Sequence, residues 1–495
     1  MIWRRHRLVL AVLSLSSISW TEEIYLSIDE TSGTARKAAF VCTGIPLGRG
    51  VVKSADVRLT SLLGRELPAF IRPLTYWPDG SIKWLRIQTQ TSLAAKERKS
   101  LILKNDRPAN PVSGLWKEES ADNVHRVSNG LLTIEFGSSG AEFIRSIRVD
   151  DKSVIHANGE AQMVLVTTAK GPESTDHENW LREADPDAAT VTAHGVIEEL
   201  YVEEKTPFRY VVRCEGGIVT GEGKRKCSFI LRYYLFRGSA RVKVEWTLIW
   251  ESDPRKNFMR QCAIRFPATL EGAAVQITRN GPSPSIKTAE EVSIVATRLD
   301  TRLHQVPRRA AKPVEVTYWQ DAQDDRTMIG AGSGKSGWLD VRMPDFRFAI
   351  AGERFAERYP KEITVSDLDV TYSLWPASTN QILDLRQFDE EELRDERNPP
   401  TTLTGHPAGL AITEQIWLDF SADAEGEDLK TQAESTLILK ARPSHYVESG
   451  VFGPLYQRDA GLFPEYEGAT DLALQWLMRS PAEFKWYGLL NDGGA

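Results

Sequence analysis

The sequence contains few cysteines and none of the spacings that mark common metal or redox sites. Four cysteines occur in 495 residues, and neither a CxxC pair nor an HExxH motif is present. The usual zinc-binding and thioredoxin-like motifs are therefore excluded. A P-loop is excluded as well, because Gly330 stands five positions before Lys335, one residue short of the required spacing. The sequence accordingly predicts neither a bound metal nor a cofactor.

Basic residues are not in excess. The formal net charge is −7 and the pI is near 5.8, which argues against a general nucleic-acid-binding protein. An acidic sugar is not excluded as a ligand, because its recognition depends on local arginines and lysines and not on the total charge. Fourteen tryptophans are present, and such rings either stack on sugars or fill the cores of β-sandwiches.

Long apolar runs are also missing, and the one short run lies at the N-terminus. Arg4, Arg5 and Arg7 precede the apolar stretch Leu8–Leu13, so residues 1–22 are interpreted as a signal peptide. No run is long enough to span a bilayer. We therefore predict a secreted or periplasmic protein without a membrane anchor. The alternative for this stretch is the frayed start of a cytosolic chain.

Two of the cysteines, Cys214 and Cys227, flank the glycine-containing part of a predicted long hairpin. Opposed positions on such a hairpin would allow a disulfide in an oxidising compartment. Two buried free thiols are the alternative, because cysteine is among the residues most often buried. The sequence alone leaves both open.

Apolar and polar residues alternate through most of the chain, with turn signals between the segments. This period of two predicts a mainly β protein. We divide it into a small β-barrel over residues 23–115 and a large antiparallel β-sandwich over residues 116–424. From residue 425 to residue 495 the apolar period becomes 3.6, which predicts a short helical C-terminal segment. One predicted helix face is formed by Leu429, Ala433, Thr436 and Leu437.

A glycine-rich segment and a tryptophan-flanked turn stand out in the predicted barrel. The first is Gly44–Gly50, with the sequence GIPLGRG, and the second is Trp77–Trp84, with the sequence WPDGSIKW. The PDG triplet suits a tight turn, because proline fixes φ, aspartate bonds its own backbone and glycine accepts a positive φ. Trp77 and Trp84 then stand on the two arms of a hairpin. The two rings either pin the hairpin or form a stacking platform for a ligand.

These two motifs together resemble the N-terminal domain of the exo-rhamnogalacturonan lyase family, also called YetA-like. The resemblance implies a RIFT-type β-barrel, then a central β-sandwich, then a C-terminal α/α barrel. Of the last domain only the beginning is expected here, within residues 425–495, so the α/α barrel is expected to be largely missing. The implied activity is that of a polysaccharide lyase, which cleaves a galacturonate-containing polymer by β-elimination. The implied partner is an acidic polysaccharide or oligosaccharide.

β-Elimination at a uronic acid requires a group that neutralises the carboxylate, a base for the C5 proton and an acid for the leaving oxygen. Arg386 follows a segment that resembles the family and is a candidate for binding the carboxylate. His406 and Tyr487 are candidates for proton transfer, and Trp375 is a candidate substrate-binding ring. The alternatives are a structural ion pair for the arginine, a surface position for the histidine and core packing for the aromatic residues.

Two other functions fit the same sequence. One is a non-catalytic carbohydrate-binding or scaffolding protein, which the short helical segment favours if a complete helical domain is needed for cleavage. The other is a lyase acting on a different uronic-acid polymer, because fold motifs do not specify the sugar.

Overall fold

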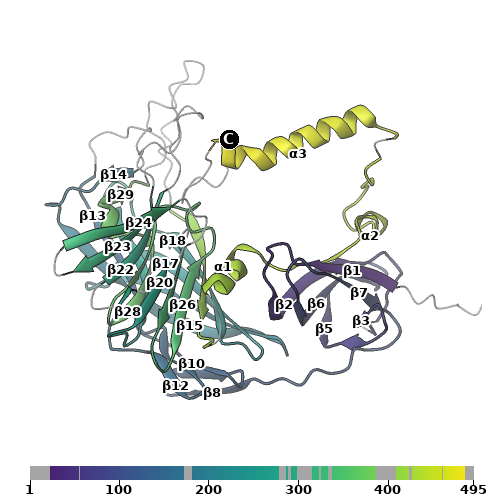
Figure 1. Cartoon of the computed structure of the whole chain (residues 1–495), viewed down its shortest axis with the longest axis horizontal. Coiled ribbons are helices and arrows are strands. Elements are labelled where there is room, and N and C mark those ends of the chain that lie inside the picture. Colours follow the sequence, from purple (N-terminus) through teal and green to yellow (C-terminus); the bar gives the residue numbers. More distant parts are fainter. Residues whose placement is uncertain are drawn as a thin grey trace, which may run out of the picture.

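The computed structural model consists mainly of antiparallel strands, arranged as a small barrel beside a large curled sandwich (Figure 1). The predicted fold class is thereby confirmed. The structure describes residues 23–54, 56–171, 181–277, 286–287, 291–297, 315–322, 325–332, 337–385, 408–422, 426–459 and 461–484.

The barrel is built from two small sheets around one apolar core. One sheet has the strand order β31-β1-β7-β3-β4 and the other has the order β2-β6-β5. Buried aliphatic side chains from both sheets, among them Leu26, Ile45, Leu85 and Leu103, form this core. The strands are β1 (Glu23–Asp29), β2 (Arg36–Pro46), β3 (Arg58–Ser61), β4 (Glu66–Leu67), β5 (Ala69–Tyr76), β6 (Ile82–Leu93), β7 (Arg98–Lys104) and β31 (Leu439–Ala441).

A five-stranded antiparallel sheet follows the linker of residues 105–116, which joins β7 to β8, and this sheet packs on the large sheet. Its order is β12-β11-β10-β9-β8, so β8 is an edge strand. Phe136 and Phe143 of this region lie in the same buried cluster as Phe229 and Tyr233 of the large sheet. The strands are β8 (Lys117–Ala121), β9 (Val124–Ser128), β10 (Leu132–Gly137), β11 (Ile144–Val149) and β12 (Lys152–His156).

The large sheet contains the remaining strands and curls enough for distant strands to pair. Additional pairings such as β18–β30 and β26–β30 bring its C-terminal strands beside its long central hairpins. The strands are β13 (Met163–Thr168), β14 (Leu181–Glu183), β15 (Thr190–Lys205), β16 (Arg209–Thr220), β17 (Arg225–Phe236), β18 (Arg241–Trp250), β19 (Phe258–Pro267), β20 (Ala274–Ile277), β21 (Ile286–Lys287), β22 (Glu291–Thr297), β23 (Glu315–Ala322), β24 (Asp325–Gly332), β25 (Gly337–Arg342), β26 (Arg347–Gly352), β27 (Lys361–Val365), β28 (Asp369–Trp375), β29 (Gln381–Leu383) and β30 (Ala411–Asp419).

The described helices follow the last strand of the sandwich, apart from the short 3-10 helix η1 (Ala377–Thr379). They are α1 (Gly426–Glu434), α2 (Pro443–Glu448) and α3 (Pro464–Phe484). Figure 1 shows α1 between the sandwich and the barrel, whereas α3 lies apart from the barrel and runs back toward the sandwich. No helix in the described part of the chain is both long enough and apolar enough to cross a membrane.

One detail of the predicted helical segment is wrong. α1 ends at Glu434, so Leu437 does not share a helix face with Leu429 and Ala433. Leu437 instead lies in the barrel core, two residues before β31, which pairs with β1. The chain thus returns from the sandwich to the barrel. There β31 pairs with the edge of β1, which a helical segment could not do.

The disulfide alternative for Cys214 and Cys227 is also wrong. In the register of β16 and β17, Cys214 lies opposite Leu231 and Cys227 lies opposite Ile218. Both thiols are buried and unpaired, and burial raises the pKa of Cys214 to about 12. The free-thiol alternative is confirmed, because the strand register keeps the two sulfur atoms out of bonding position.

Candidate functional site

The two barrel motifs form a clasp whose contacts are made within the chain. β5 and β6 form the predicted hairpin, and the Trp77 indole N–H donates to the carbonyl oxygen of Leu47 at 3.0 Å. Arg49 of the first motif forms an ion pair with Asp79 of the turn at 3.1 Å. The Lys83 ammonium lies 4.7 Å from the centroid of the Trp77 ring. These contacts indicate that the two motifs stabilise the barrel.

Three of the predicted site residues, Arg386, His406 and Tyr487, lie outside the described residues. Their roles stay predictions. The fourth, Trp375, lies on β28 with 1% of its surface exposed, and its indole N–H donates to the carbonyl oxygen of Gln381 at 3.1 Å. The strand turns this ring into the core and leaves no ring face for a sugar. Trp375 is therefore a core residue and is not accessible to a sugar.

One face of the large sheet carries partly exposed polar and aromatic side chains. The strands β17, β18, β30 and β26 lie side by side in this order. Along β18, partly exposed residues alternate with buried ones. Tyr234, Lys243 and Trp417 are paired in register across β17, β18 and β30, so their side chains point to the same side. We call this side the open face; in Figure 1 these strands lie on the side of the sandwich toward α1.

Lys243 is the central cation of the open face. Its Nζ atom lies 5.9 Å from the ring centroid of Tyr234 and 5.7 Å from that of Trp417. In the described part of the chain, no carboxylate oxygen lies within ion-pair distance of it. Burial lowers the pKa of Lys243, and the nearby Glu353 and Glu245 oppose this effect. A half-buried ammonium between aromatic rings, without a bound carboxylate, is suited to receive an anionic ligand.

Glu353 follows β26 and approaches Lys243 from the next pair of strands. Its backbone N–H donates to the carbonyl oxygen of Gln415 at 2.9 Å, which fixes its position beside β30. Burial raises the pKa of the Glu353 carboxyl, and Lys243 opposes this effect. Desolvation therefore pushes both groups toward their neutral forms. Neighbouring groups with such shifts are suited to proton transfer.

Two further donors lie on the same face. Burial raises the pKa of the Tyr234 phenol to about 12, so this group stays protonated at neutral pH. The indole N–H of Trp417 is buried, and no hydrogen-bond acceptor is found for it among the described residues.

The barrel forms one wall of this site. Phe40 of β2 lies 5.2 Å from Phe236, which stacks on Trp417 at 5.9 Å between ring centroids. On the other side of Trp417, α1 contributes Leu429 and Ala433 to the same buried cluster. The site is thus located where the barrel, the sandwich and α1 meet.

An ionic cluster fixes the barrel against this face. Glu204 at the end of β15 accepts hydrogen bonds from Arg86 at 2.6 Å and Gln88 at 2.7 Å, both on β6 of the barrel. It also accepts two bonds from Arg209 of the sandwich, at 3.0 and 2.8 Å. These contacts lower the pKa of Glu204 to about 2 despite its burial. The Arg209 guanidinium in turn lies 5.4 Å from the Tyr234 ring, so the cluster also positions one wall of the site.

A second buried ionic cluster supports β30 from behind. Glu414 lies between the open-face residues Thr413 and Gln415 and points the other way, into the sandwich. It pairs with Lys361 at 2.8 Å and accepts a hydrogen bond from Tyr372 at 3.2 Å. Burial lowers the pKa of Lys361 to about 8, although Glu414 opposes this effect. The cluster holds the strand that carries Trp417.

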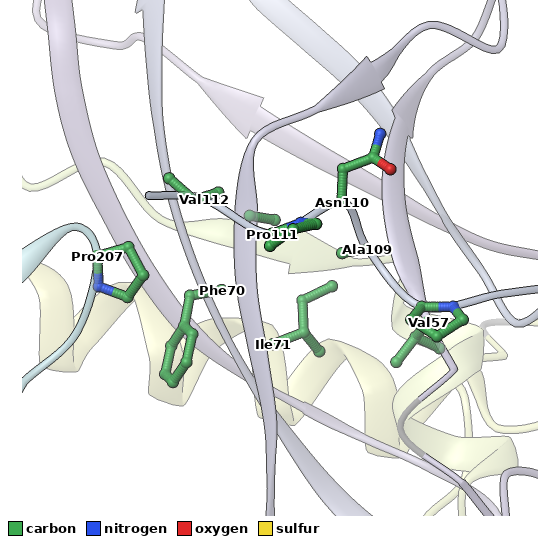
Figure 2. Close-up of a pocket in the computed structure, with 10 residues that line it drawn as sticks. Val57, Phe70, Ile71, Ala109, Asn110, Pro111, Val112 and Pro207 are labelled. Carbon is green, nitrogen blue, oxygen red and sulfur yellow. The ribbon is translucent and has the colours of Figure 1, made fainter. Parts of the chain in front are cut away.

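One cavity lies elsewhere, between the barrel and the linker. It has a volume of about 350 Å³ and is formed by β5 of the barrel, the linker before β8 and Pro207. Figure 2 shows Phe70 and Ile71 on one side and the linker residues Pro111 and Val112 on the other. Asn110 is the one side chain of the lining with hydrogen-bonding groups, so the cavity offers little for acid–base chemistry.

The sequence contained part of the signal for Lys243. The alternation of Arg241, Lys243 and Glu245 in the predicted strand already indicates a solvent-facing row. It does not indicate that Trp417 lies next to this row, because that pairing joins strands far apart in the sequence. The site was therefore missed by sequence analysis.

Comparisons with known proteins give two family matches. The model described as the PcRGLX-like N-terminal RIFT barrel domain matches residues 29–103, and that of the PcRGLX-like protein central beta sandwich domain matches residues 116–277. The uncharacterized protein YetA from Bacillus subtilis (strain 168) is 22% identical over 511 residues, which cover 93% of this chain and 58% of YetA. The chain therefore spans less than two thirds of the length of this relative.

Solved structures show weaker likeness. A protein in glycosyl hydrolase family 38 from Enterococcus faecalis is 10% identical, with a TM-score of 0.48 over 85% of this chain and 47% of that one. A putative aldose 1-epimerase from Escherichia coli K12 is 10% identical, with a TM-score of 0.28 over 60% of this chain and 98% of that one. Neither likeness is strong enough to add to the argument. Residues 29–103 thus match a PcRGLX-like N-terminal RIFT barrel domain, and residues 116–277 match a PcRGLX-like central β-sandwich domain.

Proposed function

We propose that this protein is a polysaccharide lyase that cleaves a galacturonate-containing polymer of the rhamnogalacturonan type by β-elimination. The two PcRGLX-like domains and the resemblance of the barrel motifs to rhamnogalacturonan lyases support a carbohydrate-processing role. The observation that carries the proposal is Lys243, a half-buried cation beside two aromatic rings and without a carboxylate partner among the described residues.

The proposed chemistry assigns a role to each open-face group. The Lys243 ammonium binds the uronate carboxylate and stabilises the negative charge that develops when the C5 proton leaves. Glu353, whose pKa is raised, supplies a proton to the departing O4 oxygen. The phenol of Tyr234 donates a hydrogen bond to a sugar oxygen. His406 and Tyr487 stay our candidates for the base, and Arg386 for a second carboxylate contact.

The first experiment measures product formation by the full chain. Rhamnogalacturonan and polygalacturonate fragments are incubated with the protein, and the unsaturated uronate product is followed by ultraviolet absorbance. Substitution of Lys243 by methionine keeps the aliphatic contacts with Tyr234 and Trp417 but removes the charge. A charged hydrogen bond is worth about 1.5–3 kcal/mol, so kcat/KM should fall by about 10- to 150-fold. The matched control is K117M, at an exposed position on β8.

The second experiment separates cleavage from binding. Calorimetric titration with the same oligosaccharides should show binding that K243M weakens and K117M does not. Binding without product would support the non-catalytic carbohydrate-binding alternative. Product formed only from a different uronic-acid polymer would identify that polymer as the substrate. Neither binding nor product with any of these acidic polymers would contradict the proposed site.

A further inference from the structure

A hydroxyl–imidazole pair lies on the edge hairpin β8–β9, away from the open face. The Ser120 Oγ atom lies 2.8 Å from Nδ1 of His125, its direct partner on the neighbouring strand. On the other side of the ring, Nε2 lies 3.1 Å from the Tyr210 hydroxyl, which donates to Glu118. Four side chains thus form a continuous hydrogen-bonded row from an exposed serine to a carboxylate.

The donor and acceptor of each hydrogen bond in this row follow from the charge state of Glu118. Contacts with Lys205 and Tyr210 lower the pKa of Glu118, so its carboxylate accepts the single proton of the Tyr210 hydroxyl. The phenolic oxygen is then left to accept, and Nε2 of His125 carries the proton that it donates. Nδ1 is consequently the unprotonated nitrogen, and it accepts the hydroxyl proton of Ser120. This is the tautomer that a general base for the serine requires.

Packing holds the imidazole and exposes the serine. His125 is 6% exposed and stacks on the Tyr210 ring, with 6.1 Å between centroids, while Trp116 covers the other part of that ring at 5.4 Å. Ser120 is exposed to solvent on the edge strand. In an ordinary surface hydrogen bond, water can replace the acceptor of the serine proton. Here the acceptor is the buried His125 imidazole, which water cannot easily replace.

The edge position also supplies a donor for an oxyanion. The two-residue turn of Asp122 and Asn123 makes Ala121 and Val124 the hydrogen-bonded pair that closes the hairpin. Ser120 and His125 are then the next, non-hydrogen-bonded pair, so the N–H of Ser120 points outward from the edge. Among the described strands, β8 has no second neighbour. This N–H therefore stays available for a carbonyl oxygen that approaches Ser120.

We propose that Ser120 is the nucleophile of a second, ester-hydrolysing site, with His125 as its base and Tyr210 and Glu118 as positioning residues. The substrate class is an ester between a small acyl group and a hydroxyl group of an extended polymer. An open sheet edge can contact an acyl group that protrudes from such a polymer, but it cannot enclose a whole ligand. Ser120 Oγ bonds to the acyl carbon while its proton moves to Nδ1. The ester C–O bond then breaks, and the departing alkoxide takes that proton. Water, deprotonated by the same nitrogen, releases the acid and restores the serine.

The charges around the imidazole fit this role. Burial lowers the pKa of His125; Glu118 on β8 opposes this effect and Lys205 at the end of β15 adds to it. The neutral base therefore predominates at neutral pH. The proposal is independent of the lyase proposal, because none of these residues belongs to the open face.

The test uses a fluorophosphonate probe, which reacts with activated serines, on the full chain. Trypsin cleaves after Lys117 and Arg126, and the peptide between them contains Ser120 as its one hydroxyl side chain. We expect mass spectrometry to find the probe on this peptide and absent from the next one, which contains Ser128 as an internal control. S120A should abolish labelling and the hydrolysis of p-nitrophenyl acetate while leaving oligosaccharide binding unchanged. Equal labelling of Ser120 and Ser128 would overturn the proposal.

Two variants separate the base from its supports. H125Q should slow labelling by about 100-fold, as expected for loss of a general base. Y210F keeps the ring but breaks the row, so labelling should persist and its pH dependence should shift. In the unaltered protein the rate should rise with pH and level off below the ordinary pKa of histidine. A rate that rises continuously with pH, as hydroxide attack would give, would refute the role of His125.

Discussion

Glu204 gives the sharpest test of how the barrel is held against the sandwich. Its side chain is 15% exposed and accepts four hydrogen bonds, two from barrel residues and two from Arg209. These contacts lower its pKa from 4.5 to about 2. Because one pKa unit corresponds to about 1.36 kcal/mol, the carboxylate stabilises the folded state by about 3 kcal/mol at neutral pH. We expect E204Q to lower the free energy of unfolding at pH 7 by roughly this amount.

The pH dependence has a definite sign. A pKa that is lower in the folded state gives a contribution that is complete above pH 4.5 and disappears as the pH falls toward 2. Urea unfolding of E204Q and the unaltered protein should therefore differ by about 3 kcal/mol at pH 7 and by much less at pH 3. E119Q is the matched control, because its ion pair with Arg126 is largely exposed and should contribute less than about 1 kcal/mol. An E204Q effect as small as the control, or one independent of pH, would refute this account of the interface.

Two further predictions concern the barrel clasp and the buried cluster behind β30. W77F removes the indole donor to Leu47 but keeps an aromatic ring, so the free energy of unfolding should fall by about 1–2 kcal/mol in chemical denaturation; no change would show that the clasp contributes nothing to stability. E414Q leaves the fully buried Lys361 without its counterion and should cost about 3–5 kcal/mol, whereas the double variant E414L/K361M should recover much of this loss. A double variant no more stable than E414Q would contradict the view that the unpaired charge causes the loss.

The predictions for the open face and the edge hairpin can be tested separately. K243M removes a charge from the open face without touching β8, and S120A removes a hydroxyl from the edge without touching β18. Loss of oligosaccharide binding with intact probe labelling would identify the first site alone. The reverse result would identify the second alone.

Local sequence patterns were sufficient for the strands and the hairpin. The alternation in segments such as Arg241–Trp250 requires only that one face be buried and one wet, which each strand satisfies by itself. The PDG turn likewise depends on the conformations of its own residues, and Gly80 has the positive φ that such a turn demands. Fold class follows from local preferences of this kind, summed over many strands.

The tertiary structure decided everything that depends on pairing between distant segments. The register of β16 and β17 keeps the thiols of Cys214 and Cys227 apart. β31 pairs with β1 of the barrel, although the whole sandwich lies between these two strands in the sequence. Trp375 was turned into the core by its strand, while Lys243 gained Trp417 as a neighbour through the β18–β30 pairing. A period of two specifies which face of a strand is buried but not which strand lies beside it. The sequence alone therefore determined the fold class, and only the folded sheet determined which strands and side chains lie together.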